Sequence, residues 1–316
     1  MTNIVLKLSL DQLNKVKSNY AANKVDRNAP GVVFAAKLSD VAITVYNSGK
    51  VMFQGVGATR EAAKFGDVVE SKVDSKISNQ TIKTKGDKLP EDFAQMSVLG
   101  SDETGTGDYF GPVTVAAVYV PSNKIKLIQE LGVKDSKMLT DAKMIEMAPD
   151  IMAACTYSIL TLKNEKYNEI QGKGYSQGKI KAMLHNQALK HVLNKIAPEK
   201  PDYILIDQFA ERDTYYKHIQ KQKEIVREKV LFSTKAEQLH VAVAAASILA
   251  RYAFLTEMEK LSKKCGMDLQ KGASGIVDKM AAQIWMKHGE DFLRSISKWH
   301  FANTEKARVL VNKKRG

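Results

Sequence analysis

Hydrophobic and polar residues alternate along the first part of the chain in a way that predicts a small α+β unit. Residues 4–10 alternate with a period of two, which indicates a strand, and residues 10–20 then place apolar side chains at helical spacing. Three apolar runs within 31–55, joined by tight turns, predict an antiparallel sheet, and residues 59–65 predict a short helix. We therefore expect a compact domain over residues 1–68.

The pattern changes after this domain. Residues 69–95 are rich in Ser, Lys, Asp, Gly and Thr and contain few large apolar side chains, which indicates a linker. Over residues 96–316 predicted strands alternate with predicted helices, as in an α/β domain with C-terminal helices. Its strands are predicted at 97–100, 113–120 and 202–209, its helices at 124–131, 141–155 and 180–196, and a long apolar helix follows Thr234 and Glu237, which have capping-box spacing.

The charge balance of the chain predicts a polyanionic partner. The 316 residues include 48 Lys and Arg against 35 Asp and Glu, which gives a formal net charge of +13. Residues 1–68 have nine basic and five acidic side chains, 69–96 have five of each, and 97–316 have 34 and 25. Both folded regions are therefore basic, which favours a nucleic acid as the ligand.

Other features of the composition exclude several classes of protein. Cys155 and Cys265 form no CxxC motif and accompany no His-rich tract, so a disulfide scaffold or a cysteine-ligated zinc site is not expected. The apolar run from Val241 to Ala250 is shorter than the roughly 20 residues that cross a bilayer. The first residues show no signal-peptide pattern. We expect a cytoplasmic protein that does not span a membrane.

Four acidic residues follow predicted strands in this basic chain. Asp102 and Glu103 come directly after an apolar run, Asp207 ends the run YILI, and Glu211 lies four residues further on. Acids at strand ends meet at one edge of a sheet, where oxygen-only ligands favour Mg²⁺ or Mn²⁺ over zinc. The alternative interpretation is that the Asp-Glu pair is an ordinary surface feature and that Asp207 caps a helix.

Two glycine-rich stretches do not match known phosphate-binding motifs. Gly105, Gly107 and Gly111 do not have the spacing of the dinucleotide-binding fingerprint, and a diphosphate there would face several carboxylates. The stretch beginning at Gly172 is one residue too long for a phosphate loop, and Ile180 stands where that motif has Ser or Thr. Nucleotide hydrolysis and hydride transfer are therefore disfavoured.

Six motifs, in this order, resemble those of the bacterial ribonuclease HIII family of type 2 ribonucleases H. They are GSDETGTGDYFGP, VKDSKML, AMLHNQAL, ILIDQF, KAEQLHVAVAAASILAR and HFANTEKA, within residues 97–310. The N-terminal residues are similar to the TATA-binding-protein-like substrate-binding domain of this family. The resemblance implies an α/β ribonuclease H-like catalytic domain, with a mixed sheet flanked by helices, preceded by a small α+β domain.

The resemblance also implies an activity. Members of the family hydrolyse the RNA strand of RNA/DNA hybrids, leaving 5′-phosphate and 3′-hydroxyl ends, with Mg²⁺ or Mn²⁺ as cofactor. Asp102 and Glu103 match the paired acids of the first motif, Asp207 matches the strand-end Asp, and Glu211 matches the fourth acid. These four residues are expected to be catalytic and metal-binding, with Asp102 and Asp207 sharing one of two ions.

Recognition of RNA depends on the 2′-hydroxyl, which backbone groups can reach in the shallow minor groove. Glycines permit such close approach, so Gly105, Thr106 and Gly107 are assigned to this contact. Ribonuclease HII has Arg where this chain has Thr106, which favours the HIII branch. His185 either orients substrate or has a structural role, and the further candidate substrate contacts are Ser136, Lys137, Lys173 and Asn186.

The expected partner is an RNA/DNA hybrid duplex, and we expect a monomer without an obligate protein partner. Two alternatives stay open. One is a ribonuclease HII-like enzyme that cuts at single embedded ribonucleotides. The other is a non-catalytic hybrid-binding protein in which the acids are structural.

Overall fold

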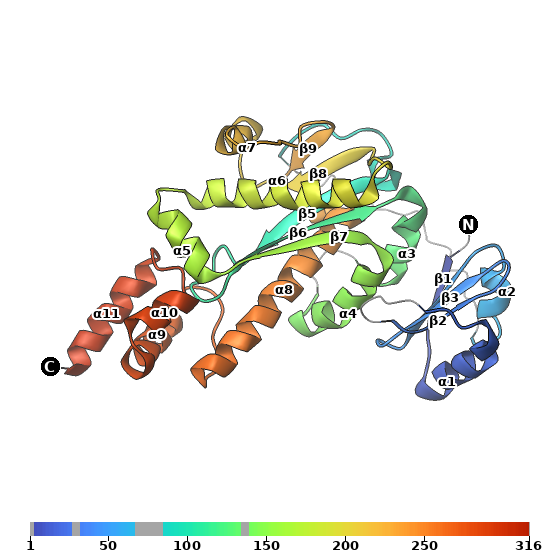
Figure 1. The fold of residues 1–316 in the computed structure, drawn as a ribbon, viewed down its shortest axis with the longest axis horizontal. Helices are drawn as coiled ribbons and strands as arrows, with labels where there is room; N and C mark the ends of the chain where they lie inside the picture. The colour runs from blue at the N-terminus through green and yellow to red at the C-terminus, as the bar shows by residue number, and fades with distance from the viewer. Residues whose placement is uncertain (1–2, 27–31, 67–84, 134–138, 316) are drawn as a thin grey trace.

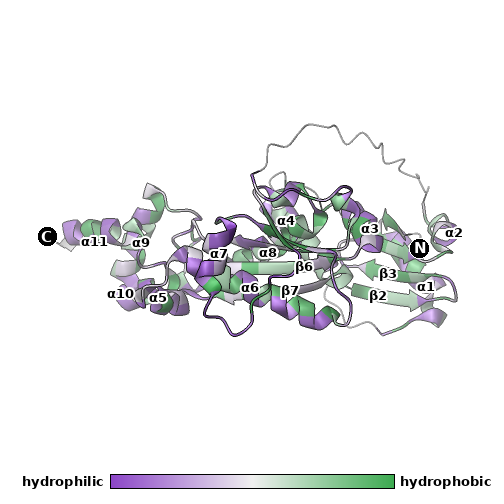
Figure 2. Cartoon of the chain, turned by 90° about the horizontal axis from the view of Figure 1, so that it is seen from above, coloured by the Kyte–Doolittle hydropathy of each residue, from purple (hydrophilic) through white to green (hydrophobic). Residues whose placement is uncertain are grey.

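The computed structural model describes residues 3–26, 32–66, 85–133 and 139–315. Two separate β-sheets organise these residues, one of four strands and one of five (Figure 1). Viewed from above, the N-terminal sheet and the C-terminal helices lie at opposite ends of the five-stranded sheet (Figure 2).

The N-terminal sheet confirms the antiparallel strands predicted from the alternation of apolar residues. Its strands are β1 (Asn3–Lys7), β2 (Val32–Lys37), β3 (Ala42–Tyr46) and β4 (Lys50–Gln54), in the order β1-β4-β3-β2. Helix α1 (Leu10–Asn19) begins with a capping box between Ser9 and Gln12, and α2 (Ala58–Ala62) is a short helix after the sheet. One face of the sheet and these helices enclose a small apolar core.

The second sheet is mixed. Its strands are β5 (Val98–Thr104), β6 (Val113–Val120), β7 (Thr156–Leu162), β8 (Tyr203–Asp207) and β9 (Val230–Ser233). They lie in the order β7-β6-β5-β8-β9, with β5 antiparallel to β6 and parallel to β8. Every residue of β6 is buried, as its unbroken apolar sequence predicts for a central strand.

Helices cover both faces of this sheet (Figure 1). The helices α6 (Gln177–Ile196) and α7 (Arg212–Ile219) cover one face. The other face carries α3 (Ile125–Glu130), α4 (Asp141–Ala154) and α8 (Val241–Cys265). Helix α8 approaches β5 so closely that a Cβ at Gly100 would lie 2.5 Å from the backbone nitrogen of Val243. Only glycine fits at this position.

Helix α8 is long and apolar enough to cross a membrane by length and composition, but 56% of its most apolar window is buried inside the protein. It is a core helix packed on the sheet. Its N-cap is His240, whose Nδ1 accepts from the backbone N–H of Ala242 at 3.0 Å. The predicted capping box of Thr234 and Glu237 is therefore wrong, because the helix begins at Val241 and Glu237 lies in a separate 3-10 turn.

The remaining helices form a C-terminal subdomain around a third core. It consists of α9 (Gly275–His288), α10 (Glu290–Ile296) and α11 (Ala302–Arg315), and α5 (Asn164–Gly172) packs against α10. Trp285 and Trp299 pack against each other there, with ring centroids 5.6 Å apart. This subdomain packs against the turn between β5 and β6, because Tyr109 and Phe110 of that turn are buried in its core.

Residues 85–95, which the sequence places in a linker, pack against the domain built on the five-stranded sheet. Gly86 pairs with Ser233 in an isolated bridge, Asp87 binds Arg212, and Phe93 is buried in the core beside α8. The N-terminal sheet is joined to the same domain by polar contacts, since Ser48 Oγ lies 2.7 Å from Asp150 Oδ2.

Candidate active site

Two carboxylates meet at the ends of adjacent parallel strands. The register of β5 and β8 places Asp102 beside Asp207 at the carboxyl edge of the sheet. The backbone N–H of Glu103 donates to Asp102 Oδ1 at 2.7 Å, and that of Ala236 donates to Asp207 Oδ1 at 2.9 Å. The convergence of these two acids, expected from their strand-end positions, is a direct result of the strand pairing.

The surroundings of both carboxylates oppose their ionisation. Burial raises the pKa of Asp102 well above its ordinary value, and the negative charges of Asp207 and Glu103 add to this effect. Burial also raises the pKa of Asp207, and the charges of Glu237 and Glu103 act in the same direction. Neighbouring carboxylates of this kind repel each other unless a cation compensates them.

Glu103 makes a different set of contacts. Its carboxylate accepts from Lys181 Nζ at 2.9 Å and lies 2.8 Å from His185 Nε2. His185 Nδ1 is in turn 2.8 Å from Ser101 Oγ, and its ring packs on Phe209. Burial tends to raise the pKa of Glu103, but the hydrogen bond and charge of His185 and the charge of Lys181 lower it overall. His185 therefore orients an acidic side chain, which answers the question that the sequence left open.

The fourth predicted acid, Glu211, is exposed, whereas the other three are recessed. It is the N-cap residue of α7 and makes no side-chain hydrogen bond to that helix. A different acid, Glu237, is 6% exposed and contributes to the raised pKa of Asp207. Sequence reasoning assigned Glu237 to a helix cap. Its position shortly after β9, the neighbour of β8, is the signal that could have identified it.

The carboxylates that the structure describes offer donors suited to a divalent cation but do not enclose a metal site. Within the described ranges, no three His, Cys, Asp or Glu side chains lie close enough together to enclose a metal ion. The donor chemistry fits, because Asp102, Glu103 and Asp207 offer the carboxylate oxygens that Mg²⁺ and Mn²⁺ prefer. The raised pKa of Asp102 further indicates that positive charge is lacking there. Asp102 and Asp207 could hold a cation, whereas the carboxylate of Glu103 is paired with Lys181 and His185 in this structure.

The turn between β5 and β6 begins directly after these acids. Gln177 Nε2 at the start of α6 donates to the carbonyl of Thr106 at 2.8 Å. The backbone N–H of Tyr109 donates to the carbonyl of Gly272 at 2.9 Å. In the part of the chain that the structure describes, the backbone N–H groups of Thr106 and Gly107 donate no hydrogen bond to another residue. These two donors are therefore available to a ligand.

The two glycines flanking Thr106 have different reasons to be glycine. Gly105 has a φ of +92°, and a Cβ there would lie 2.2 Å from the carbonyl oxygen of Pro112. The fold itself therefore requires glycine at this position. Gly107 is exposed, and a Cβ there would have no heavy atom within 4 Å. The fold therefore does not require glycine at 107.

Among the other predicted contacts, Asn186 is 1% exposed. Its Nδ2 donates to the carbonyl of Glu224, and its Oδ1 accepts from the backbone N–H of Val226, both at 2.9 Å. It holds a loop, so this geometry does not support a substrate contact by its side chain. Lys173 is exposed and pairs with Glu169 at 2.5 Å. Ser136 and Lys137 lie outside the described residues.

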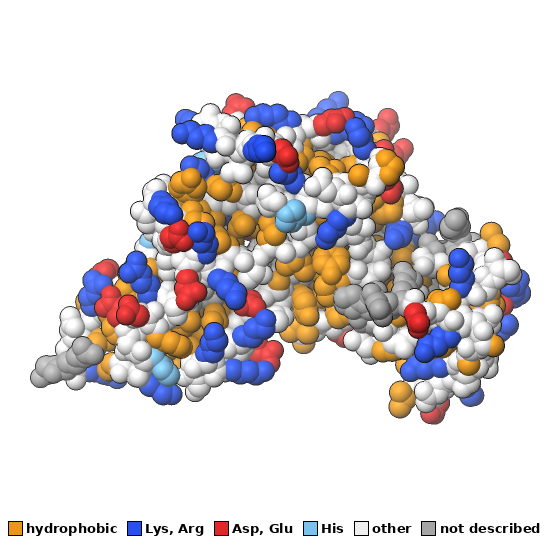
Figure 3. Space-filling model, viewed as in Figure 1, with side chains coloured by type: hydrophobic (Ala, Val, Ile, Leu, Met, Phe, Trp, Pro, Cys, Tyr) orange, Lys and Arg blue, Asp and Glu red, His pale blue; other side chains and the backbone are white. Residues whose placement is uncertain are grey.

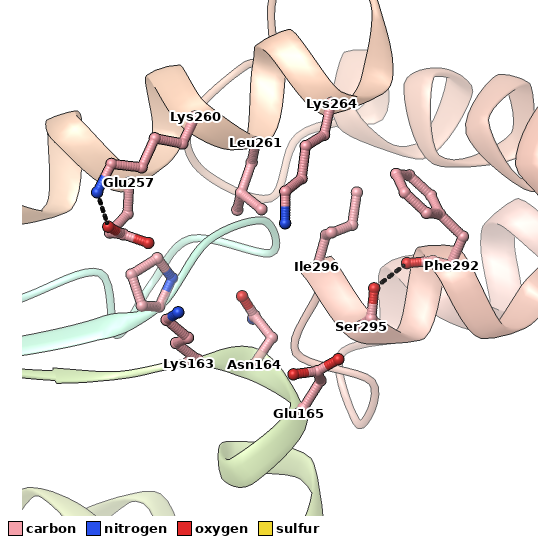
Figure 4. A pocket seen from close by; sticks show the side chains of 11 residues that line it. Lys163, Asn164, Glu165, Glu257, Lys260, Leu261, Lys264, Phe292, Ser295 and Ile296 are labelled. Atoms are coloured by element: carbon pink, nitrogen blue, oxygen red, sulfur yellow. Dashed lines mark hydrogen bonds and ion pairs between the residues drawn. The ribbon is translucent and has the colours of Figure 1, made fainter.

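A pocket of about 210 Å³ lies on the C-terminal side of the turn (Figure 4). Asn164 and Lys163 border it from the start of α5, Leu261 and Lys264 from α8, and Ile296 from α10. None of the four predicted acids lines it. This pocket is therefore separate from the carboxylates, and it backs the turn, because Asn164 Nδ2 donates to the carbonyl of Gly111 at 2.8 Å.

Positive charge is spread widely over the visible surface. Figure 3 shows Lys and Arg side chains on the N-terminal domain, around α7 and on the helices at the C-terminal end, with Asp and Glu interspersed. A long polyanion could thus be contacted at several places, as the charge of both regions predicts.

Comparison with known proteins decides the family. The profile of the family described as Ribonuclease HII matches residues 99–304, and that of a domain of unknown function (DUF3378) matches residues 3–78. Ribonuclease HIII of Lysinibacillus sphaericus (strain C3-41) is 64% identical over 311 residues, covering 98% of this chain and 100% of that protein. The chain belongs to the ribonuclease HIII family.

Other ribonuclease HIII proteins agree with this assignment. The Bacillus subtilis (strain 168) protein is 50% identical and is covered in full, as is this chain. The crystal structure of Bst-RNase HIII in complex with Mn²⁺ is 43% identical, with a TM-score of 0.69, and the match covers 99% of this chain and 100% of that one. The expected ribonuclease H-like fold and the expected metal-dependent ribonuclease are therefore confirmed.

Proposed function

We propose that this ribonuclease HIII family member cuts the RNA strand of RNA/DNA hybrids with two Mg²⁺ or Mn²⁺ ions at Asp102, Glu103 and Asp207. The observation that carries the proposal is the proximity of Asp102 and Asp207, which directly follow the paired residues Ser101 and Ile206 of β5 and β8 and raise each other's cost of ionisation. The turn with two unused backbone donors begins three residues after Asp102. When bound, such ions supply an activated water and compensate the negative charge that develops on the leaving 3′-oxygen.

The residues of this chain prepare the site for that chemistry. Asp102 and Asp207 would hold the cations, because their charges are uncompensated by any neighbouring Lys or Arg that the structure describes within ion-pair distance. Glu103 would complete the ligand set, and its orientation depends on His185, whose ring is fixed by Ser101 on its other side. No side-chain nucleophile is needed, and cleavage would leave 5′-phosphate and 3′-hydroxyl ends.

Selection of RNA would come from the turn. The backbone N–H groups of Thr106 and Gly107 are the available donors beside the acids, and a 2′-hydroxyl can accept from them in a wide, shallow minor groove. The exposed Gly107 carries no Cβ to block a sugar. DNA lacks the 2′-oxygen and would leave these donors unpaired, which disfavours it.

The N-terminal domain would extend the contact with the duplex. Residues 1–68 have an excess of positive charge, nine basic against five acidic side chains, as does the catalytic domain. We further propose that the protein works as a monomer in the cytoplasm. The free, buried thiols of Cys155 and Cys265 support a reducing compartment.

A panel of three duplexes tests the proposal. We expect cleavage of an RNA/DNA hybrid in Mg²⁺ or Mn²⁺, little cleavage of a DNA duplex with one embedded ribonucleotide, and none of an all-DNA duplex. Cleavage confined to the single-ribonucleotide duplex would favour the ribonuclease HII-like alternative. Tight binding of the hybrid without cleavage would favour the non-catalytic alternative and would overturn the proposal.

A further inference from the structure

The last of the six sequence motifs has no role in the proposed chemistry, yet the segment just before it reaches the turn that follows the acids. Lys298, between α10 and this motif, is fully buried with 0% exposure. Its Nζ donates to the carbonyls of Asp108 and Gly111, each at 2.7 Å, and lies 3.5 Å from that of Pro112. A buried ammonium group is thus surrounded by carbonyl oxygens of the turn.

The backbone of the same segment reinforces this contact. The N–H of Lys298 donates to the carbonyl of Tyr109 at 2.8 Å, and the N–H of Gly111 donates to the carbonyl of Ile296 at 3.0 Å. Phe110 and Ser297 pair as an isolated bridge. The far half of the turn is therefore fixed to the C-terminal subdomain, which lies remote in sequence from β5 and β6.

Burial of the charged lysine side chain costs free energy, which its contacts must offset. Burial lowers the pKa of Lys298 to about 7, and the carboxylate of Asp108 only partly offsets this. The aromatic face of Tyr167, 5.9 Å from Nζ, is the other favourable neighbour. A hydrophobic side chain would fill the same space without the cost of desolvating a charge. What only the lysine supplies is its set of hydrogen bonds to the turn.

We propose that Lys298 is a positioning residue for RNA recognition, which holds the turn so that the backbone N–H groups of Thr106 and Gly107 face the sugar of the hybrid. The inference rests on the proposed function. Lys298 itself contacts no substrate, because it lies beneath the turn and is fully buried. Its effect is transmitted through the carbonyls of Asp108 and Gly111, which follow the two recognition donors in the chain.

Two asparagines of α5 hold the turn and the segment around Lys298. Asn164 and Asn168 are both buried, lie one helical turn apart on α5, and each donate through Nδ2 to backbone carbonyls. Asn164 donates to Gly111 of the turn at 2.8 Å. Asn168 donates to Arg294 and Ser297, both at 2.9 Å, and accepts from the backbone N–H of Trp299 at 3.0 Å, so it holds the residues on either side of Lys298.

The test is a double-mutant cycle that combines substitutions in the enzyme with removal of one 2′-hydroxyl from the substrate. We would measure kcat/KM for wild type, Lys298→Met, Asn164→Ala and Asn168→Ala on two hybrids. One hybrid has an all-RNA strand, and the other has a single 2′-deoxynucleotide beside the scissile phosphate. Folding of each variant is checked by thermal unfolding, and if Lys298→Met does not fold, Asn164→Ala carries the test.

For Lys298→Met we expect roughly a tenfold or greater loss on the all-RNA strand but less than about threefold on the deoxy strand, because the lost contact is the one that the deoxy strand lacks. Asn164→Ala and Asn168→Ala should show the same coupling at a smaller size, because the first loosens the turn and the second loosens the segment that carries Lys298. Equal losses on both strands for Lys298→Met and Asn164→Ala would overturn the inference alone. A wild type that does not cleave the all-RNA hybrid would overturn the proposed function, and the inference with it.

Discussion

The surroundings of Asp102 disfavour the ionised form of its carboxyl group. Its pKa is raised by burial and by the charges of Asp207 and Glu103, so the ionised form costs stability in the absence of a cation. We expect Asp102→Asn to abolish cleavage while stabilising the metal-free protein by roughly 1 to 2 kcal/mol, as is common when a strained functional group is removed. Denaturant unfolding in EDTA measures this.

Adding Mn²⁺ provides the control for that prediction. Wild type should gain stability with Mn²⁺ concentration because the folded state binds the ion, and Asp102→Asn should gain much less. An Asp102→Asn protein that is less stable than wild type in EDTA would contradict the electrostatic account of the site.

Glu211 and Glu237 differ in their relation to the paired acids. Glu237 is buried and acts on Asp207, whereas Glu211 is exposed at the start of α7. For Mn²⁺ binding without substrate we expect Glu237→Gln to weaken affinity about tenfold, a typical effect for a group supporting a metal ligand, and Glu211→Gln to change it by less than about twofold. Titration calorimetry with both variants checks this. The reverse order of effects would show that Glu211 is the fourth acid of the metal site even without substrate.

Gly105 and Gly107 form a second contrasting pair. Alanine at 105 meets the carbonyl of Pro112 and a positive φ, so Gly105→Ala should lower stability by about 1 kcal/mol or more. Alanine at 107 meets open space, so stability should stay within about 0.5 kcal/mol of wild type, while the KM for the hybrid rises. Gly107→Ala with unchanged KM would remove this residue from substrate recognition.

At the scale of elements, the packing of α8 on the sheet depends on its N-cap. His240 is 3% exposed, and its ring accepts from Ala242 N–H through Nδ1 while Nε2 lies 3.1 Å from the carbonyl of Met96. The bond from Ala242 requires a neutral ring with an unprotonated Nδ1, so that Nε2 carries the proton and donates to Met96. Burial lowers the pKa of His240 from 6.5 to about 4.

The pH dependence follows from this shift. Above pH 6.5 the ring is neutral in both the folded and the unfolded state, and its contribution to stability is fully present. As the pH falls, the unfolded state binds a proton first, so stability is lost between about pH 6.5 and pH 4, by roughly 3 kcal/mol in total. We expect the unfolding free energy of wild type, minus that of His240→Asn, to fall over this range. A difference that does not change with pH would contradict the assigned role.

Periodicity predicted most of the elements but not their neighbours in space. The strands β5, β6 and β8 are marked by apolar runs and by the acids at their ends. The strands β7 and β9 were not predicted, because TYSILTL mixes polar and apolar residues and VLFS is only four residues long. The cap at His240 was missed because histidine is an uncommon N-cap and Thr234 offered a more familiar pattern.

The site likewise contains some residues that the sequence could predict and others that it could not. Asp102 and Asp207 could be predicted because strand-end acids converge wherever their strands are adjacent. The contacts of Lys298 and Glu237 could not, because they depend on how segments remote in sequence pack together. Asn186 was predicted as a substrate contact because an amide on a mixed helix gives no sign of the loop to which its side chain binds in this structure.

At the scale of the whole molecule, the two domains form one structure with excess positive charge on both. The N-terminal sheet contacts the catalytic domain through Ser48 and Asp150 and through the pairing of Lys50 with Asp150. Residues 85–95 lie on the catalytic sheet, so the connection between the domains is shorter than the composition of 69–95 suggests. A hybrid duplex bound at the acids could thus extend toward either end of the molecule.

The central claim is that Asp102 and Asp207 form a metal-dependent site that cuts RNA paired with DNA. The most direct test is cleavage of an end-labelled RNA/DNA hybrid by wild type and Asp102→Asn, in Mg²⁺, in Mn²⁺ and in EDTA. We predict 5′-phosphate products from the wild type with either metal, none in EDTA, and a loss of at least about a thousandfold in the variant. Cleavage by Asp102→Asn at a rate near that of wild type, or cleavage in EDTA, would contradict the account.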